Sequence, residues 1–207
     1  MGVLPRLLRS GIRPGQHRRG AVHAAKAIAG HALLAGAVAL LGPGAVAQAS
    51  VQPAAEVSAA LPGVQRAGAS RLTVWGFEIY DASLWVAPGF RAAEWAGQPL
   101  ALELQYLRKF DGDDIARRSL DEMQRVGPIA PEQAALWLRT MTQAFPDVQK
   151  GDRLTGIYEP GVGVRFLHNG RTTANVRDPQ FAQRFFAIWL GPKSSEPALR
   201  EALLGKK

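Results

Sequence analysis

The sequence predicts an α+β fold, in which an antiparallel sheet packs against a separate group of helices. Three observations lead to this prediction. Strand-like segments occur before Asp111 and again after Lys150. They are recognised either by β-branched and aromatic residues or by alternation of apolar residues with period two. Segments with helix-capping residues lie between and after them, and Gly and Pro pairs mark the turns. The resulting order of strands, helices, strands and helices is typical of helices segregated from an antiparallel sheet.

The first 49 residues have the layout of a signal peptide. Residues 1–26 contain basic residues and no acidic residue, and Ala27–Leu41 is apolar apart from one histidine. Gly42-Pro43-Gly44 then breaks a helix, and the small residues of Ala45–Ser50 provide an A-x-A cleavage pattern. We expect cleavage after Ala49, with the position after Ala47 as the second choice, and hence a periplasmic or secreted protein.

A retained membrane anchor is the alternative interpretation of the same leader. The apolar stretch Ala27–Leu41, at about 1.5 Å per residue, would reach about 22 Å, which is short of a hydrocarbon core about 30 Å thick. We therefore predict a signal peptide over residues 1–49 and no stable membrane span after its removal.

The remainder of the chain divides into two parts. Residues 50–61 contain Ala, Gln and Pro and are expected to form a flexible lead-in, and residues 62–205 are expected to form one domain. An apolar fraction of 47% in 207 residues is enough for a core without disulfides or metal.

Two segments predict the first strands of the sheet. Arg71–Val86 is rich in β-branched and aromatic residues and is either two strands around Gly76 or one strand with a bulge there. Leu100–Arg108 alternates with period two over its whole length, which predicts another strand.

Two helices are predicted next. Asp111-Gly112-Asp113 begins the first, since acidic residues are favourable at a helix N-terminus, and Gly127-Pro128 ends it. Pro131 opens the second in its first turn, and Pro146 ends it after Phe145. The residues expected on the buried sides are Ile115, Leu120, Met123 and Val126 in the first helix, and Leu138, Met141 and Phe145 in the second.

A three-strand meander follows, with strands predicted at Arg153–Glu159, Val164–His168 and Arg171–Val176. Pro160-Gly161 joins the first two strands, and Asn169-Gly170, a strong hairpin signal between apolar runs, joins the last two.

The chain is predicted to end in two helices. Asp178-Pro179 caps a helix that ends at Gly191-Pro192, and Ser195-Glu196-Pro197 begins a shorter one that runs to Leu204. The first of them carries the apolar residues Phe181, Phe185, Ile188 and Trp189.

Charge and composition exclude several classes of function. Six of the 25 Lys and Arg residues precede Glu56, the first of 17 acidic residues, so the net charge of +8 belongs mostly to the leader. No basic stripe is left to follow a phosphate backbone, and we expect no nucleic acid partner. Without cysteine, the chain has no thiol nucleophile, Cys-bound zinc or disulfide.

No motif identifies a catalytic centre, a metal site or a cofactor. His168 is the one histidine after the leader, and no G-x-S-x-G motif occurs, which argues against a serine hydrolase. Asp111, Asp113 and Asp114 are interpreted as helix-capping residues rather than metal ligands. We therefore assign no catalytic residue and expect neither metal nor cofactor.

Two arginines in predicted strands are the best candidate binding residues. Arg71 and Arg108 lie among apolar neighbours. Each either pairs with a carboxylate such as Glu103 or points into a pocket, where a guanidinium would bind an anionic or ketone oxygen.

Several segments taken in order resemble the chalcone isomerase-like family, specifically its bacterial exported branch. The resemblance runs from about Pro62 to Gly205 and includes Arg71, Phe77–Trp85, Leu102–Arg108, Gly151–Leu154, Asn169-Gly170, and the C-terminal segment Phe181–Gly205.

The resemblance implies an open-faced β-sandwich, with a large antiparallel sheet packed against helices and a cleft for an apolar ligand. Plant enzymes of this family close a chalcone to a flavanone, whereas other members bind fatty acids and lack the reaction. Arg71 matches the family arginine that contacts the ligand oxygen. The enzyme's threonine, tyrosine and asparagine fall at Tyr80, near Ile115 and near Glu122, so most of the catalytic pattern is missing.

The resemblance leads to three hypotheses about function. The first is an exported, non-catalytic protein that binds a small apolar or amphipathic ligand such as a fatty acid, with its head near Arg71. The second is an isomerase, an intramolecular lyase acting on a chalcone-like enone, with Tyr80 or Tyr106 as hydroxyl donor. The third is a structural or partner-binding periplasmic protein. The ligand-binding candidates are Arg71, Tyr80, Tyr106 and Arg108.

Overall fold

The structure is a computed structural model that describes residues 52–205. The predicted signal peptide and both cleavage positions lie outside the described residues and remain predictions.

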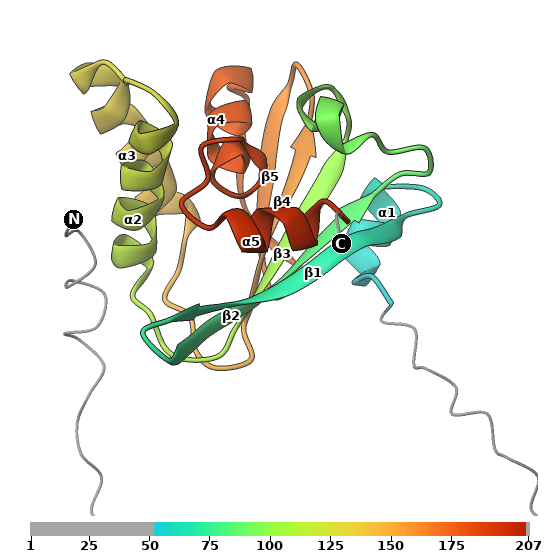
Figure 1. The fold of residues 1–207 in the computed structure, drawn as a ribbon. Coiled ribbons are helices and arrows are strands. Elements are labelled where there is room, and N and C mark those ends of the chain that lie inside the picture. Colours follow the sequence, from blue (N-terminus) through green and yellow to red (C-terminus); the bar gives the residue numbers. More distant parts are fainter. Residues whose placement is uncertain (1–51, 206–207) are drawn as a thin grey trace, which may run out of the picture. The chain divides into compact units, whose positions relative to one another are not determined.

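A six-stranded antiparallel sheet forms the centre of the described chain (Figure 1). The order of the strands in the sheet is their order in the chain, so each strand pairs with its sequence neighbours. The strands are β1 (Gln65–Val74), β2 (Phe77–Val86), β3 (Leu100–Tyr106), β4 (Arg153–Glu159), β5 (Gly163–His168) and β6 (Arg171–Val176).

Every predicted strand is present, but β1 begins earlier than predicted, β3 ends at Tyr106 rather than Arg108, and β5 begins at Gly163 rather than Val164. The two-strand interpretation around Gly76 is right, because Trp75 and Gly76 form a turn with φ of 50° and 81°, the two positive values that a type I′ hairpin turn requires. However, β1 begins at Gln65, six residues before the predicted Arg71. The extra residues are small or polar and contain a register shift between Arg66 and Gly68, so no alternation of apolar residues marks them.

Four helices cover one face of the sheet: α2 (Gly112–Val126), α3 (Pro131–Ala144), α4 (Pro179–Leu190) and α5 (Pro197–Leu203). A large apolar core lies between them and the sheet. Asp178 caps α4, since its carboxylate accepts a hydrogen bond of 2.9 Å from the backbone N–H of Phe181. The predicted α+β fold with an antiparallel sheet is therefore confirmed.

The buried face of α2 differs from the prediction. Met123 is buried as expected, but Ile115, Leu120 and Val126 are only partly buried. The other buried residues of the helix are small or polar, namely Gly112, Ala116, Ser119 and Glu122.

Two short elements were missed by the sequence analysis. The helix α1 (Ala55–Ala60), drawn in cyan in Figure 1, lies within the segment expected to be a flexible lead-in, and the 3-10 helix η1 (Ala92–Gly97) precedes β3. Val57 and Leu61 are buried in a second core with Trp85, Ala101, Ile157 and Leu167, on the face of the sheet opposite α2–α5. This burial corrects the prediction, since two apolar residues anchor the segment although it has no long periodic pattern.

None of the helices in residues 52–205 is both long and apolar enough to cross a membrane.

Candidate functional site

A cavity of about 160 Å³ lies between the helix-covered face of the sheet and the helices. Strand side chains form one wall, and α2, α4 and the start of α5 contribute the other. Apolar residues dominate the lining, among them Leu102, Leu104, Phe110, Ile115, Phe185 and Ile188. An apolar hollow with a few polar groups is the usual form of a small-molecule site.

The alternation of the strands places two tyrosines together in the lining. Tyr80 of β2 pairs with Tyr106 of β3 in the sheet register, and side chains of such a pair stand on the same face. Their rings meet edge to face, with centroids 5.9 Å apart. Trp189 lies on α4, in the opposite wall of the cavity, and its indole Nε1 donates a hydrogen bond of 2.9 Å to the Tyr80 hydroxyl.

Both phenols stay protonated at neutral pH. Burial raises the pKa of Tyr106 well above its ordinary value, with a smaller contribution from Tyr80. Burial likewise raises the pKa of Tyr80, although the hydrogen bond from Trp189 partly opposes the rise. Within residues 52–205 neither phenolic hydrogen has an acceptor at hydrogen-bond distance. The cavity therefore presents two hydroxyl donors that can serve a ligand oxygen.

Three charged residues also line the cavity. Arg118 and Glu122 lie one helical turn apart on α2, and the guanidinium Nη2 is 2.5 Å from the carboxylate Oε1. Glu196 precedes α5 and also lines the cavity. Burial raises the pKa of Glu196, and the Glu122 charge raises it further. The charges of Glu196, Arg118 and Glu122 all act on the Tyr80 phenol, which lines the same cavity.

Arg71, the leading candidate from the sequence, does not line this cavity. In the sheet register Leu72 pairs with Tyr80, so Leu72 faces the cavity and the adjacent Arg71 faces the other way. Its guanidinium binds both oxygens of Asp81, at 2.6 and 2.8 Å, and also pairs with Glu78. The side chain is 44% exposed. Of the two alternatives for Arg71, the structure shows pairing with carboxylates, with Asp81 and Glu78 rather than Glu103, and not the pocket-facing orientation on which its choice as a binding residue depended.

Arg108 also lies outside the cavity lining. It follows β3, and its guanidinium carbon stands 4.9 Å from the centre of the Phe77 ring, a cation–π contact at the tip of the β1–β2 hairpin. Of the four predicted binding residues, the structure thus brings Tyr80 and Tyr106 to the cavity and leaves Arg71 and Arg108 outside it.

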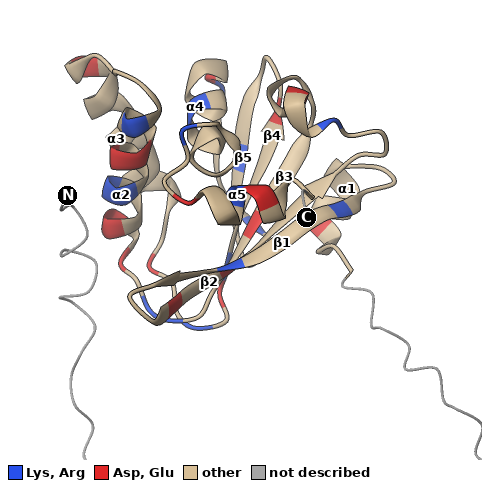
Figure 2. Cartoon of the chain, in the orientation of Figure 1, with Lys and Arg blue, Asp and Glu red and all other residues tan. Residues whose placement is uncertain are grey.

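Sequence reasoning missed Arg118, Glu122 and Glu196 as lining residues. Their signal was weak, because charged residues four apart on a helix usually indicate a solvated face. The available clue was that Glu122 falls near the asparagine of the family's catalytic pattern. Figure 2 shows that acidic and basic residues alternate along α2, so charge alone does not distinguish its two faces.

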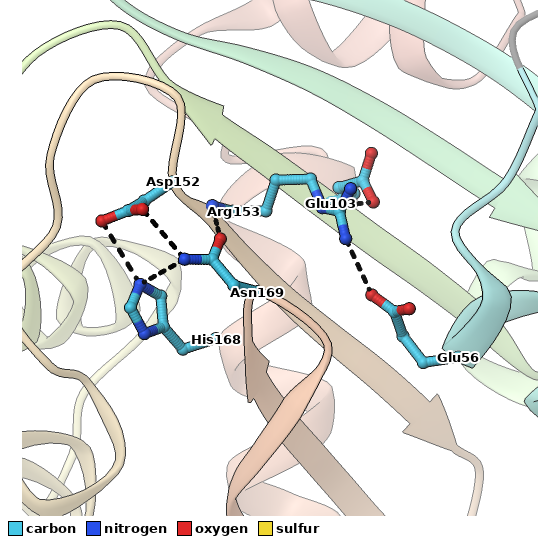
Figure 3. A network of polar contacts seen from close by, with 6 residues as sticks. All are labelled: Glu56, Glu103, Asp152, Arg153, His168 and Asn169. Carbon is cyan, nitrogen blue, oxygen red and sulfur yellow. Dashed lines mark hydrogen bonds and ion pairs between the residues drawn. The ribbon is translucent and has the colours of Figure 1, made fainter.

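A separate polar network lies outside the cavity lining and partly on the opposite face of the sheet (Figure 3). Arg153 of β4 lies between two carboxylates, 3.1 Å from Glu56 of α1 and 3.4 Å from Glu103 of β3. Asp152 accepts a 2.9 Å hydrogen bond from Asn169 and lies 3.4 Å from the His168 ring. These contacts tie α1 and the β5–β6 turn to the sheet, which is a structural role.

Burial raises the pKa of Glu103 in this network, and the nearby Arg153 charge opposes the rise. Within residues 52–205 no three His, Asp or Glu side chains gather closely enough to hold a metal ion.

Comparisons with known proteins agree with this architecture. The model of the family described as chalcone isomerase-like matches residues 45–205. Among solved structures, a fatty-acid binding protein of Arabidopsis thaliana superposes with a TM-score of 0.53 and 11% sequence identity, over 70% of this chain and 88% of that one. At this identity the superposition shows a shared fold. No curated protein matches the sequence. The family match covers most of the chain and all of its described strands and helices, and the chain therefore belongs to the chalcone isomerase-like family.

Proposed function

We propose that this protein binds a small amphipathic molecule and acts as a carrier or sensor rather than as a catalyst. The observation that carries the proposal is the apolar cavity, whose lining also includes a few polar and charged groups. A volume of about 160 Å³ admits on the order of ten water-sized groups, which suits a single aliphatic chain of medium length.

The lining suggests how such a molecule would lie. Its chain would run between the strand residues Leu102 and Leu104 and the α4 residue Phe185, where burial of apolar surface favours binding. Its polar head would take hydrogen bonds from the hydroxyls of Tyr80 and Tyr106. The Arabidopsis protein of this fold is named for binding fatty acids, so an aliphatic chain is the natural first probe.

The arrangement favours binding over isomerisation. Closing a chalcone ring requires stabilisation of an oxyanion and hydroxyl groups that hold water. The arginine expected for the first task, Arg71, is paired with Asp81 and Glu78 outside the cavity. Ile115, near the place of the family's catalytic tyrosine, contributes an apolar side chain to the lining. If naringenin chalcone cyclised faster with the protein than without it, the isomerase hypothesis would replace this one.

The cavity also argues against a purely structural protein, because such a protein would be expected to fill its core.

Binding can be tested with a variant that fills the cavity. Ser119 is buried on α2 and lines the hollow, so the ring of Ser119→Phe would occupy the space of the ligand chain. We expect the purified protein to retain dodecanol or dodecanoic acid in native mass spectrometry, and Ser119→Phe to reduce affinity at least ten-fold.

Two controls accompany this test. Ser58→Phe makes the same change at an exposed position of α1, and Arg71→Gln alters a residue outside the lining. Both should bind as the unchanged protein does. Absence of binding to the unchanged protein, or equal binding by a folded Ser119→Phe, would contradict the proposal.

We further infer that the protein is exported, because its N-terminal residues have a basic region, an apolar stretch and a small-residue cleavage pattern. Mass spectrometry of the protein recovered from a bacterial periplasm should find a mature N-terminus at Ser50 or Gln48. Recovery of the intact chain in the membrane fraction would favour the anchor interpretation.

A further inference from the structure

The charged residues of the cavity lining carry more negative than positive charge. Among the described residues that line the cavity, Arg118 is the one cation, whereas Glu122 and Glu196 are both carboxylates. The remaining polar lining is uncharged and includes Ser119, Ser194 and Ser195 together with the tyrosines.

The positive charge of Arg118 is already engaged. Its guanidinium lies 2.5 Å from Glu122, whose side chain is only 7% exposed. Glu122 receives a second contact, at 3.2 Å, from Arg125, which is not part of the lining. The charge of Arg118 is therefore offset by Glu122, and a ligand carboxylate would enter beside two carboxylates without meeting a net positive charge among the lining residues. Such entry is unfavourable where burial weakens solvent screening.

The pKa of Glu196 agrees with this balance of charge. Burial raises this pKa first, the charge of Glu122 raises it further, and the charge of Arg118 opposes the rise without cancelling it. An additional anion would meet the same burial and the same negative charge of Glu122.

A hydroxyl group, by contrast, matches the hydrogen-bonding groups of the lining. The Glu122 and Glu196 carboxylates accept hydrogen bonds, and the Tyr80 and Tyr106 hydroxyls donate them. An alcohol both donates and accepts, and it adds no charge. We propose that the Arg118–Glu122–Glu196 cluster selects a ligand with an uncharged, hydroxyl-bearing head over one with a carboxylate head. This inference rests on the proposed function, because it concerns the head group of the molecule that the cavity binds.

Two ligands that differ only in their heads test the inference. Dodecanol and dodecanoic acid, below their aggregation concentrations at pH 7.5, would each displace Nile red from the purified protein. We expect dodecanol to bind at least ten-fold more tightly than dodecanoic acid.

Removing one negative charge should shift this preference toward the acid. Glu122→Gln frees Arg118, and Glu196→Gln removes a carboxylate for which no ion pair is found among residues 52–205. We expect each variant to raise the affinity for the acid relative to the alcohol at least ten-fold. Glu196→Gln keeps the test valid if Glu122→Gln fails to fold. The matched control is Glu132→Gln, on the exposed start of α3 and outside the lining, which should leave the ratio unchanged.

The outcomes separate the two proposals. If dodecanoic acid binds the unchanged protein as tightly as dodecanol, or if the ratio is the same in both variants, the head-group inference is overturned while ligand binding stands. If neither molecule binds, the proposed function fails, and the head-group inference fails with it.

Discussion

At the tip of the β1–β2 hairpin, Trp75 has a backbone conformation that its residue type does not favour. Trp75 has a φ of 50° and is 64% exposed, at a turn position where Asn or Gly is usual. A left-handed backbone costs an L-residue other than Gly about 1–2 kcal/mol, and Asn bears it more easily because its side chain hydrogen-bonds locally. Trp75 therefore occupies its position at a cost to stability.

Replacing Trp75 with Asn should stabilise the protein, because Asn-Gly suits the type I′ turn that Trp75-Gly76 forms. We expect the free energy of unfolding to rise by about 0.5–1 kcal/mol in urea denaturation. Trp75→Ala is the control, since alanine removes the indole and keeps the steric cost at positive φ. Equal gains in the two variants would show that exposure of the indole, and not backbone strain, is the cause.

Helix α5 packs closely against β1, the strand at one edge of the sheet. The two approach so closely that a Cβ built on Gly68 would stand 1.9 Å from the carbonyl oxygen of Ala202. Because a backbone atom blocks the space, the helix itself would have to move to admit a side chain. Gly68 is therefore required by a contact between elements that are distant in sequence.

Substituting Gly68 with Ala should lower the free energy of unfolding by about 1–3 kcal/mol, the usual cost of forcing extra volume into a packed contact. Gly97→Ala is the matched control, because a Cβ there meets no atom within 4 Å. Urea denaturation of the two variants measures the difference. A loss of equal size in both would mean that α5 does not constrain Gly68 as the structure indicates.

All three tyrosines of the chain are buried in the folded protein. Burial raises the pKa of each of them, Tyr80, Tyr106 and Tyr158. Above pH 10 the unfolded chain releases these phenolic protons while the folded protein retains them. The folded state then binds more protons, so stability falls as the pH rises.

The alkaline titration should therefore be cooperative. We expect little phenolate absorbance at 295 nm near pH 10 while circular dichroism remains native, and its appearance together with unfolding at higher pH. In concentrated urea the same protein should titrate near pH 10, the ordinary value for tyrosine. A native protein whose tyrosines ionise one by one near pH 10 would show that the cavity and core are open to water.

Local pattern was enough to predict most of the elements. The ends of β4 and β6 agree with the prediction, because alternation and the Asn169-Gly170 turn are short-range signals. The N-terminal part of β1 and the helix α1 were missed, because contacts with α5 and with Trp85 hold them in place.

For the candidate site, the alternation of side chains along a strand already implies that Arg71 and Leu72 point to opposite faces of the sheet. The sequence does not indicate which of the two faces the helices cover, and the packing of the folded chain settles this. As a result, Leu72 and Tyr80 face the cavity, and Arg71 pairs with Asp81 on the other side. Glu122 also lines the cavity, although the charges of its helix indicate a solvated face in the sequence. The physical reason is that period and propensity act within a segment, whereas burial depends on what packs against it.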